Sequence, residues 1–194
     1  MTGNMLPKEC VRANVLLLGD PRLRRVSEPV GSISDPAYIT DKHRLQITLE
    51  EFRARHGFGR AISAPQIGVP LRFVALHLDR PFVIANPVIT WKSSETFTMW
   101  DDCMSFPWLM VRLKRHRSIS LQYVDEDGRT REWRELEQST SELLQHEIDH
   151  LDGILAIDRA LDRESVISRE VYEGDVSWFA KQVDYVIPKL QVDI

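Results

Sequence analysis

The sequence has few cysteines, no long apolar run and no excess of basic residues. Two cysteines in 194 residues, Cys10 and Cys103, are too few for a disulfide framework and indicate a reducing, intracellular compartment. No apolar run approaches the roughly 20 residues that a membrane span needs, and residues 1–12 lack the apolar stretch of a signal peptide. The formal net charge of −4 argues against a general nucleic-acid binder. We therefore do not expect a membrane protein, a secreted disulfide scaffold or a nucleic-acid binder.

The rest of the composition is typical of an ordinary globular protein, with 43% hydrophobic and 28% charged residues. Neither an internal repeat nor a linker-like cluster of proline and glycine divides the chain. A chain of this length fits one hydrophobic core. We therefore predict a single domain over residues 1–194.

The pattern of apolar residues predicts helices and strands in separate parts of the chain. Residues 36–56 interleave apolar with charged residues, as a helix does, and Gly57 provides a stop. Residues 15–18 predict a short strand, and residues 72–136 contain several β-rich runs bounded by turn residues. The Asp-Gly pair within residues 125–128 is typical of a hairpin turn. Separate strands and helices favour an α+β fold over alternating βαβ units.

A second helix is predicted immediately before Gly153, a residue type that often follows a helix end. Ser139 and Glu142 have the spacing of a capping box at the helix start. Inside this helix lies the sequence His146-Glu147-Ile148-Asp149-His150, an H-E-x-x-H pattern. Because four residues make a little more than one turn, both imidazoles project from one face and can hold one metal ion. Glu147, beside the first histidine, can take a proton from a water molecule there.

A hydrolytic metal site usually has three protein ligands, and the third is not evident from this pattern alone. A metzincin motif needs a third histidine where this chain has Ala156, so that interpretation fails. Glu170 and Glu173 are candidates of the kind found in thermolysin-like zincins. Cys103 is the other candidate, because a thiolate is a strong ligand for a borderline-soft divalent metal. Cys10 has no metal-ligating neighbours and is predicted to be structural.

Three segments of the chain carry a family resemblance. Residues 145–153, Q-H-E-I-D-H-L-D-G, resemble the third signature of the peptide deformylases. Residues 101–105, D-D-C-M-S, are similar to the second signature, E-G-C-L-S, and residues 59–68, G-R-A-I-S-A-P-Q-I-G, to the first, G-x-G-x-A-A-P-Q-x-G. Residues 20–24, D-P-R-L-R, also match the opening of that family. The motifs occur in the family's order up to about residue 158, and the tail beyond matches less clearly.

The resemblance implies a fold in which antiparallel strands pack around a central helix that carries the HExxH motif. It implies three metal ligands: Cys103, His146 and His150. Glu147 would be the general base, while Gln66 and the backbone N–H of Met104 would stabilise the oxyanion. Taken without the family, Gln66 is better explained by hydrogen bonds to its own loop.

The resemblance also implies the reaction and its participants. One divalent ion per chain would be ferrous iron in the usual native form, with nickel, cobalt or zinc able to replace it. The substrate would be the N-terminal formyl-methionine of a nascent polypeptide, and formate would be released. The expected partners are the formylated nascent chain and the ribosome, with which the protein would associate. The expected compartment is a bacterial cytoplasm or an organelle.

The signatures depart from the family pattern at six positions: Arg60, Ala61, Ser63, Asp101, Asp102 and Met104. Ala61 and Asp102 replace glycines. Arg60 stands at a position that is usually aliphatic in the family, near the pocket for the side chain of the substrate's first residue. With Gly59, these three are the predicted substrate-binding residues. Since Arg60 and Asp102 carry opposite charges, one hypothesis is that they pair across the substrate entrance. The apolar cluster Trp108–Met110 is predicted to line a pocket or to belong to the core.

These departures leave alternatives to deformylation of formyl-methionine open. The chain could be a divergent paralogue that hydrolyses another N-acyl amide. It could also be a metal-containing protein that binds peptide N-termini without catalysis. A zincin protease with a glutamate as third ligand is the most distant alternative.

Overall fold

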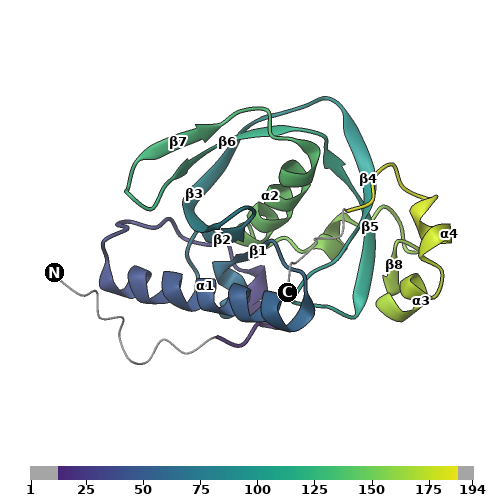
Figure 1. Cartoon of the computed structure of the whole chain (residues 1–194), viewed down its shortest axis with the longest axis horizontal. Coiled ribbons are helices and arrows are strands. Elements are labelled where there is room, and N and C mark those ends of the chain that lie inside the picture. The colour runs from purple at the N-terminus through teal and green to yellow at the C-terminus, as the bar shows by residue number, and fades with distance from the viewer. Residues whose placement is uncertain (1–12, 188–194) are drawn as a thin grey trace.

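The computed structural model describes residues 13–187, and Cys10 lies outside this range (Figure 1). Five strands form an antiparallel sheet in the order β1-β2-β3-β6-β7. They are β1 (Ala61–Ser63), β2 (Phe73–His77), β3 (Pro81–Lys92), β6 (Ile119–Val124) and β7 (Thr130–Trp133). Ile62 of β1 pairs with Ala75 of β2. The prediction of strands within residues 72–136 is confirmed.

A second, three-stranded antiparallel sheet has the order β4-β5-β8. Its strands are β4 (Thr96–Asp101), β5 (Leu109–His116) and β8 (Val166–Ser168). The α-helices are α1 (Pro36–His56), α2 (Gln138–Leu151), α3 (Arg169–Gly174) and α4 (Val176–Ala180). Short 3-10 helices span Pro21–Arg24, Ala64–Ile67 and Ala156–Arg159. The α+β class is confirmed.

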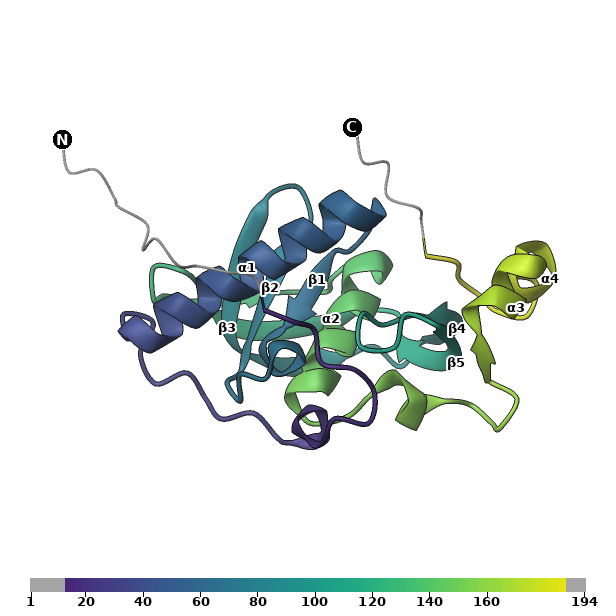
Figure 2. The ribbon, with the colours of Figure 1, turned by 90° about the horizontal axis from the view of Figure 1, so that it is seen from below.

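Helix α2 lies in the centre of the molecule, between the five-stranded sheet and strands β4 and β5 (Figures 1 and 2). Leu144 and Leu151 pack on Leu76, Ile84 and neighbouring side chains of that sheet. Every residue of α2 from Thr140 to Leu151 is buried. Because buried polar groups must find partners, the histidines and carboxylates of this helix depend on contacts with other segments.

Helix α1 covers another part of the same sheet (Figure 2). It has the predicted limits: Asp35 caps its first turn, and Gly57 ends it at a φ of 72°. Its buried side chains include Tyr38, whose ring packs edge-on against Phe73 of β2 at 5.1 Å between centroids. The Asp-Gly hairpin turn between β6 and β7 is also confirmed, with Gly128 at a φ of 79°.

Two local predictions are wrong. Residues 15–18 form no strand, because they bond to segments that are not strands: Leu16 donates to the carbonyl of Gln66, in the 3-10 helix Ala64–Ile67, at 2.7 Å and Leu18 to that of Ser105 at 2.8 Å. Ser139 and Glu142 form no capping box, since α2 begins one residue before Ser139. The Glu142 carboxylate pairs instead with Arg60, a residue far away in sequence.

The C-terminal part contributes α3 and α4, which lie beside the three-stranded sheet at one end of the molecule (Figure 1). Phe179 of α4 packs edge-on against Trp100 of β4, whose indole N–H donates to the carbonyl of Phe179 at 3.0 Å. Gly153, predicted to follow α2, has a φ of 72°, and a Cβ there would lie 2.6 Å from the carbonyl oxygen of Arg24. Among the helices of residues 13–187, none is long and apolar enough to cross a membrane.

Candidate metal centre

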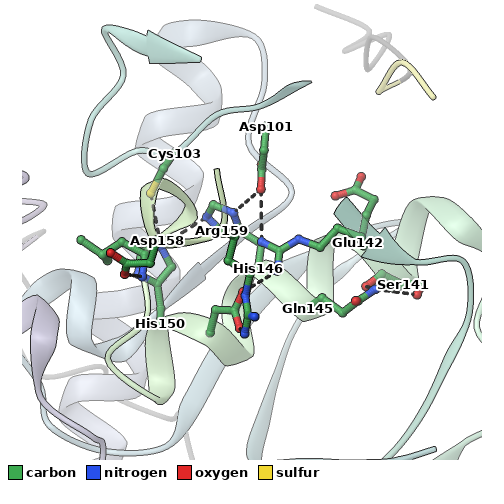
Figure 3. A network of polar contacts seen from close by, with 12 residues as sticks. Asp101, Cys103, Ser141, Glu142, Gln145, His146, His150, Asp158 and Arg159 are labelled. Carbon is green, nitrogen blue, oxygen red and sulfur yellow. Dashed lines mark hydrogen bonds and ion pairs between the residues drawn. The ribbon is translucent and has the colours of Figure 1, made fainter. Parts of the chain in front are cut away.

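Three side chains from two segments converge beside α2 (Figure 3). His146 and His150 come from successive turns of the helix, and Cys103 from the loop after β4. Nε2 of His150 lies 3.2 Å from Sγ of Cys103 and 3.2 Å from Nε2 of His146. Ligand atoms around a tetrahedral ion with metal–N and metal–S bonds of normal length are about 3.3–3.6 Å apart. These two separations are close to those around one divalent ion, and all three ligand atoms lie within 4.8 Å of one another.

In the described part of the chain, no other group of three or more histidine, cysteine or acidic residues comes close enough to hold a metal ion. Glu173 lies on α3 and faces Arg169 at 3.9 Å, and Glu170 does not join the group either. Two imidazoles and a thiolate suit iron, cobalt, nickel or zinc, whereas magnesium and calcium prefer oxygen ligands. The donor set therefore fits the divalent ions that the sequence resemblance implies, and the zincin alternative lacks its third ligand.

Asp101, the last residue of β4, orients His146. Its Oδ2 lies 2.9 Å from Nδ1 of His146 and 3.3 Å from a guanidinium nitrogen of Arg115 (Figure 3). Burial raises the pKa of Asp101, but His146 and Arg115 more than offset this and hold it at about 2. A carboxylate on Nδ1 fixes the ring so that Nε2 faces the metal position. Burial lowers the pKa of His150, as does the charge of His146, which favours the neutral, ligating imidazole.

We expect Asp101→Asn to weaken metal binding by about 10- to 100-fold, the usual cost of losing a partner that orients a ligand. Asparagine keeps the size of the side chain and removes the charge that holds His146. Competition with a chromophoric chelator measures the affinity. The matched control is Asp102→Asn, since the adjacent carboxylate contacts Arg169 and not His146. Equal affinities of the Asp101 variant and the unmodified protein would contradict the assigned contact.

Glu147 lies between the two histidines in sequence and is 3% exposed. The hydroxyl of Ser63 donates to the Glu147 carboxylate and also contacts its backbone carbonyl at 2.9 Å. Burial raises the pKa of Glu147, and His146 and Ser63 offset part of this rise. A carboxylate with a raised pKa can both take up and return a proton near neutral pH.

Gln66 and Met104 lie beside the Cys103–His146–His150 group. The Gln66 side chain accepts a hydrogen bond from the backbone N–H of Ser63 at 2.9 Å, and its Nε2 lies 3.2 Å from Oγ of Ser105 and 3.6 Å from Sγ of Cys103. Its amide thus satisfies its own loop and also faces the metal ligands. The N–H of Met104 has no hydrogen-bond partner among the described residues.

A cavity of about 450 Å³ opens beside these groups. One wall comes from residues 57–61, a second from residues 100–104 and a third from the helix face that carries Glu142 and His146. The C-terminal part supplies the fourth wall with residues that include Arg169, Tyr172 and Tyr185. The cavity therefore gives a substrate access to Cys103, His146 and Glu147.

The four predicted substrate-binding residues all line this cavity: Gly59, Arg60, Ala61 and Asp102. Gly59 has a φ of 118°, and a Cβ there would lie 3.0 Å from the side chain of Met104, so the position needs glycine. The hypothesis that Arg60 pairs with Asp102 is wrong. Arg60 pairs with Glu142, and Asp102 accepts from Arg169 at 2.6 Å.

The apolar cluster after the second signature divides between the two predicted roles. Met110 is buried and lines the cavity, while Leu109 packs in the core around β4 and β5. Trp108 is 47% exposed and belongs to neither. Alternation along β5 explains why Leu109 and Met110 face opposite sides of the strand, whereas Trp108 precedes β5.

Sequence reasoning missed the contacts of Ser63, Asp101 and Tyr185. Ser63 and Asp101 are visible as departures from the family pattern: Ser63 has a hydroxyl where the family has alanine, and Asp101 replaces a glutamate. The sequence does not show, however, which residues these two side chains contact. Tyr185 has no sequence signal. Its hydroxyl is buried and has no hydrogen-bond partner in the range 13–187, and its ring packs against Phe97.

Comparisons with known proteins agree with this geometry. The chain is 36% identical over 163 residues to peptide deformylase 1 of Prochlorococcus marinus (strain MIT 9313), covering 78% of this chain and 82% of that protein. It is 37% identical over 158 residues to a protein named peptide deformylase-like from Brucella melitensis, covering 77% and 90%.

Solved structures show the same similarity. The peptide deformylase of Thermotoga maritima superposes with a TM-score of 0.70 and 31% identity, covering 78% of this chain and 99% of that one. The Synechococcus elongatus enzyme in complex with actinonin gives a TM-score of 0.71 and 27% identity, covering 79% and 81%. The family model for polypeptide deformylase matches residues 12–166. The chain, with its Cys–His–His group beside Glu147, therefore belongs to the peptide deformylase family.

Proposed function

We propose that this chain is a metal-dependent hydrolase that removes the formyl group from the N-terminal formyl-methionine of nascent polypeptides and releases formate. One observation carries the proposal. Glu147 lies beside the Cys103–His146–His150 group on the wall of a substrate-sized cavity, in a chain whose residues 12–166 match the deformylase family. All three ligand positions and the base are present, although other positions in the signatures have changed.

Cys103, His146 and His150 would hold the ion. When bound, a divalent ion there makes a neighbouring water more acidic and polarises the formyl carbonyl. Asp101 keeps His146 in the orientation that this requires. The buried position of the group restricts bulk water around the reacting atoms.

Glu147 carries the proton through the reaction. It accepts a proton from the attacking water as the water oxygen bonds to the formyl carbon, and it gives a proton to the amine nitrogen as the C–N bond breaks. The products are formate and a free N-terminal amine. Nε2 of Gln66 and the N–H of Met104 donate to the carbonyl oxygen while negative charge develops there. Ser63 holds the carboxylate in place between these groups.

The substrate-binding residues in this proposal are Gly59, Arg60, Ala61 and Asp102. Gly59 allows the loop before β1 to approach Met104 closely. Ala61 and Arg60 present their side chains to the same cavity as Glu147, and Asp102 lies across from them with Arg169. The pair of Asp102 and Arg169 joins the loop of the second signature to α3.

Formate release from formyl-Met-Ala-Ser tests the proposed function. Protein purified without oxygen and loaded with nickel or iron should release formate, and removal of the metal by a chelator should stop the reaction. Acetyl-Met-Ala-Ser is the comparison substrate, and faster release of acetate would favour hydrolysis of another N-acyl amide. No turnover with one metal bound per chain would favour a protein that binds peptide N-termini without catalysis.

We also propose ferrous iron as the native metal, a bacterial cytoplasm or an organelle as the compartment, and association with the ribosome. The Cys–His–His donor set supports iron but suits nickel, cobalt and zinc as well. The metal content of protein isolated from its own host without oxygen tests the first point. Co-sedimentation with ribosomes that carry a formylated nascent chain tests the association.

A further inference from the structure

A buried ion pair forms part of the cavity wall. Arg60, which precedes β1, and Glu142, on α2, pair with side chains that are 15% and 2% exposed. Arg60 also donates to the backbone carbonyl of Ser139 at 2.8 Å. The two residues are 82 positions apart in sequence, so only the tertiary fold brings this pair into the cavity.

The pair lies one helical turn from the metal ligands. Glu142 precedes His146 by four residues on the same face of α2, a rise of about 6 Å. Figure 3 shows the Glu142 carboxylate on the side of the helix where Asp101 and Cys103 lie. A side chain of four non-hydrogen atoms extends about 5–6 Å from its Cα. The side chain of a formylated residue therefore reaches this wall when its formyl group lies beside Glu147.

This wall has unused hydrogen-bond donors. A guanidinium has five N–H donors, and Arg60 uses donors on two nitrogens for Ser139 and Glu142. The hydroxyl of Tyr185, whose ring lines the same cavity, has no partner among residues 13–187. An aliphatic side chain pressed against the Arg60 guanidinium, whose side chain is 15% exposed, would remove its water and give no hydrogen bond in return. A side chain with an acceptor near its end would replace that water. The Tyr185 hydroxyl is already buried without a partner, so only an acceptor placed beside it would satisfy it.

We propose that the Arg60–Glu142 pair, together with Tyr185, makes this protein select formylated residues whose side chain ends in a hydrogen-bond acceptor. The inference rests on the proposed deformylase function and extends its substrates from formyl-methionine to other formylated residues. Glutamine has such an acceptor, methionine has a weakly accepting sulfur, and norleucine, of the same length, has none. Met110 and Leu143 supply apolar contacts to the stem that all three side chains share.

The kcat/KM values for formyl-Gln-Ala-Ser, formyl-Met-Ala-Ser and formyl-norleucine-Ala-Ser test the inference on the nickel-loaded protein. We expect the glutamine peptide to exceed the norleucine peptide at least tenfold, mostly through KM, with methionine between them. A preference for norleucine would overturn the inference. If no formyl peptide turns over, the proposed function fails, and binding of the same peptides to the Glu147→Gln variant by calorimetry still reports the preference.

A paired variant locates the source of the preference. Arg60→Leu with Glu142→Leu removes both charges together and leaves neither unpaired. We expect the kcat/KM ratio of the glutamine peptide to the norleucine peptide to fall at least tenfold. The Tyr185→Phe variant should lower the same ratio by a smaller factor. The control is Lys42→Leu with Glu126→Leu, a distant ion pair that does not line the cavity. An equal loss on all three peptides would show contact with the peptide backbone and overturn the assignment to the side chain.

Discussion

Replacing Glu147 with glutamine is expected to lower formate release by about 10²- to 10⁴-fold, the usual contribution of a general base. The protein should still bind its metal, because glutamine leaves Cys103, His146 and His150 unchanged. Glutamine keeps the shape of the side chain and can accept a hydrogen bond from Ser63, but it cannot take a proton from water. Release of formate from formyl-Met-Ala-Ser and metal content per chain, measured on the same preparation, separate the two effects.

Glu173→Gln is the matched control for this variant, because Glu173 is another glutamate of the same cavity and lies on α3, away from the metal group. We expect its kcat to stay within a few-fold of the unmodified protein. Turnover by Glu147→Gln close to that of the unmodified protein would show that another group moves the proton. Loss of metal from the variant would mean that Glu147 acts on the ligands and not on the substrate.

Replacing Cys103 with alanine is expected to abolish stoichiometric metal binding. The thiolate is the one ligand that does not come from α2, and without it the two imidazoles keep an incomplete donor set. The loss of affinity should exceed the roughly 10- to 100-fold effect expected for Asp101→Asn, which only orients a ligand. Metal content after dialysis and affinity by chelator competition are the measurements, and formate release should fall in parallel.

Because Cys103 is buried in the core around β4 and β5, the alanine variant needs a test of folding. Cys103→Ser nearly preserves the volume, and circular dichroism of both variants without metal should match that of the unmodified protein without metal. Glu173→Ala tests the rival ligand and should leave one metal bound per chain. A Cys103 variant that still held one ion per chain would refute the assigned ligand set.

Local signals in the sequence predicted α1, α2 and the hairpin turn, but not the short helices α3 and α4. The start of α1 has Asp35 as a cap and Pro36 in the first turn, and Gly57 can adopt the left-handed conformation that ends the helix. The proximity of the two candidate metal-ligating histidines was predictable because both lie on one helix, where a spacing of four residues determines the geometry. Cys103 remained one of several candidates until the resemblance to the family was considered, since it lies 43 residues before His146.

The failed predictions share a physical cause. Residues 15–18 have the apolar character of a strand, yet Leu16 and Leu18 donate to the carbonyls of Gln66 and Ser105, neither of which lies in a strand. Glu142 has the spacing of a capping residue, yet Arg60 provides a stronger, charged partner in a buried place. In each case a segment distant in sequence competes with the local arrangement, and local pattern contains no information about it.

The sequence by itself determined the fold class, the helix that carries the candidate metal-ligating histidines, and the family, because periodicity and short motif spacings act within a few residues. The tertiary structure decided which charges meet. Arg60 pairs with Glu142 and Asp102 with Arg169, across separations of 82 and 67 residues. Such pairs depend on where packed elements place their side chains in three dimensions, and a charge as buried as that of Glu142 also needs a partner. The substrate preference proposed for the cavity is therefore a property of the packing of β1 against α2.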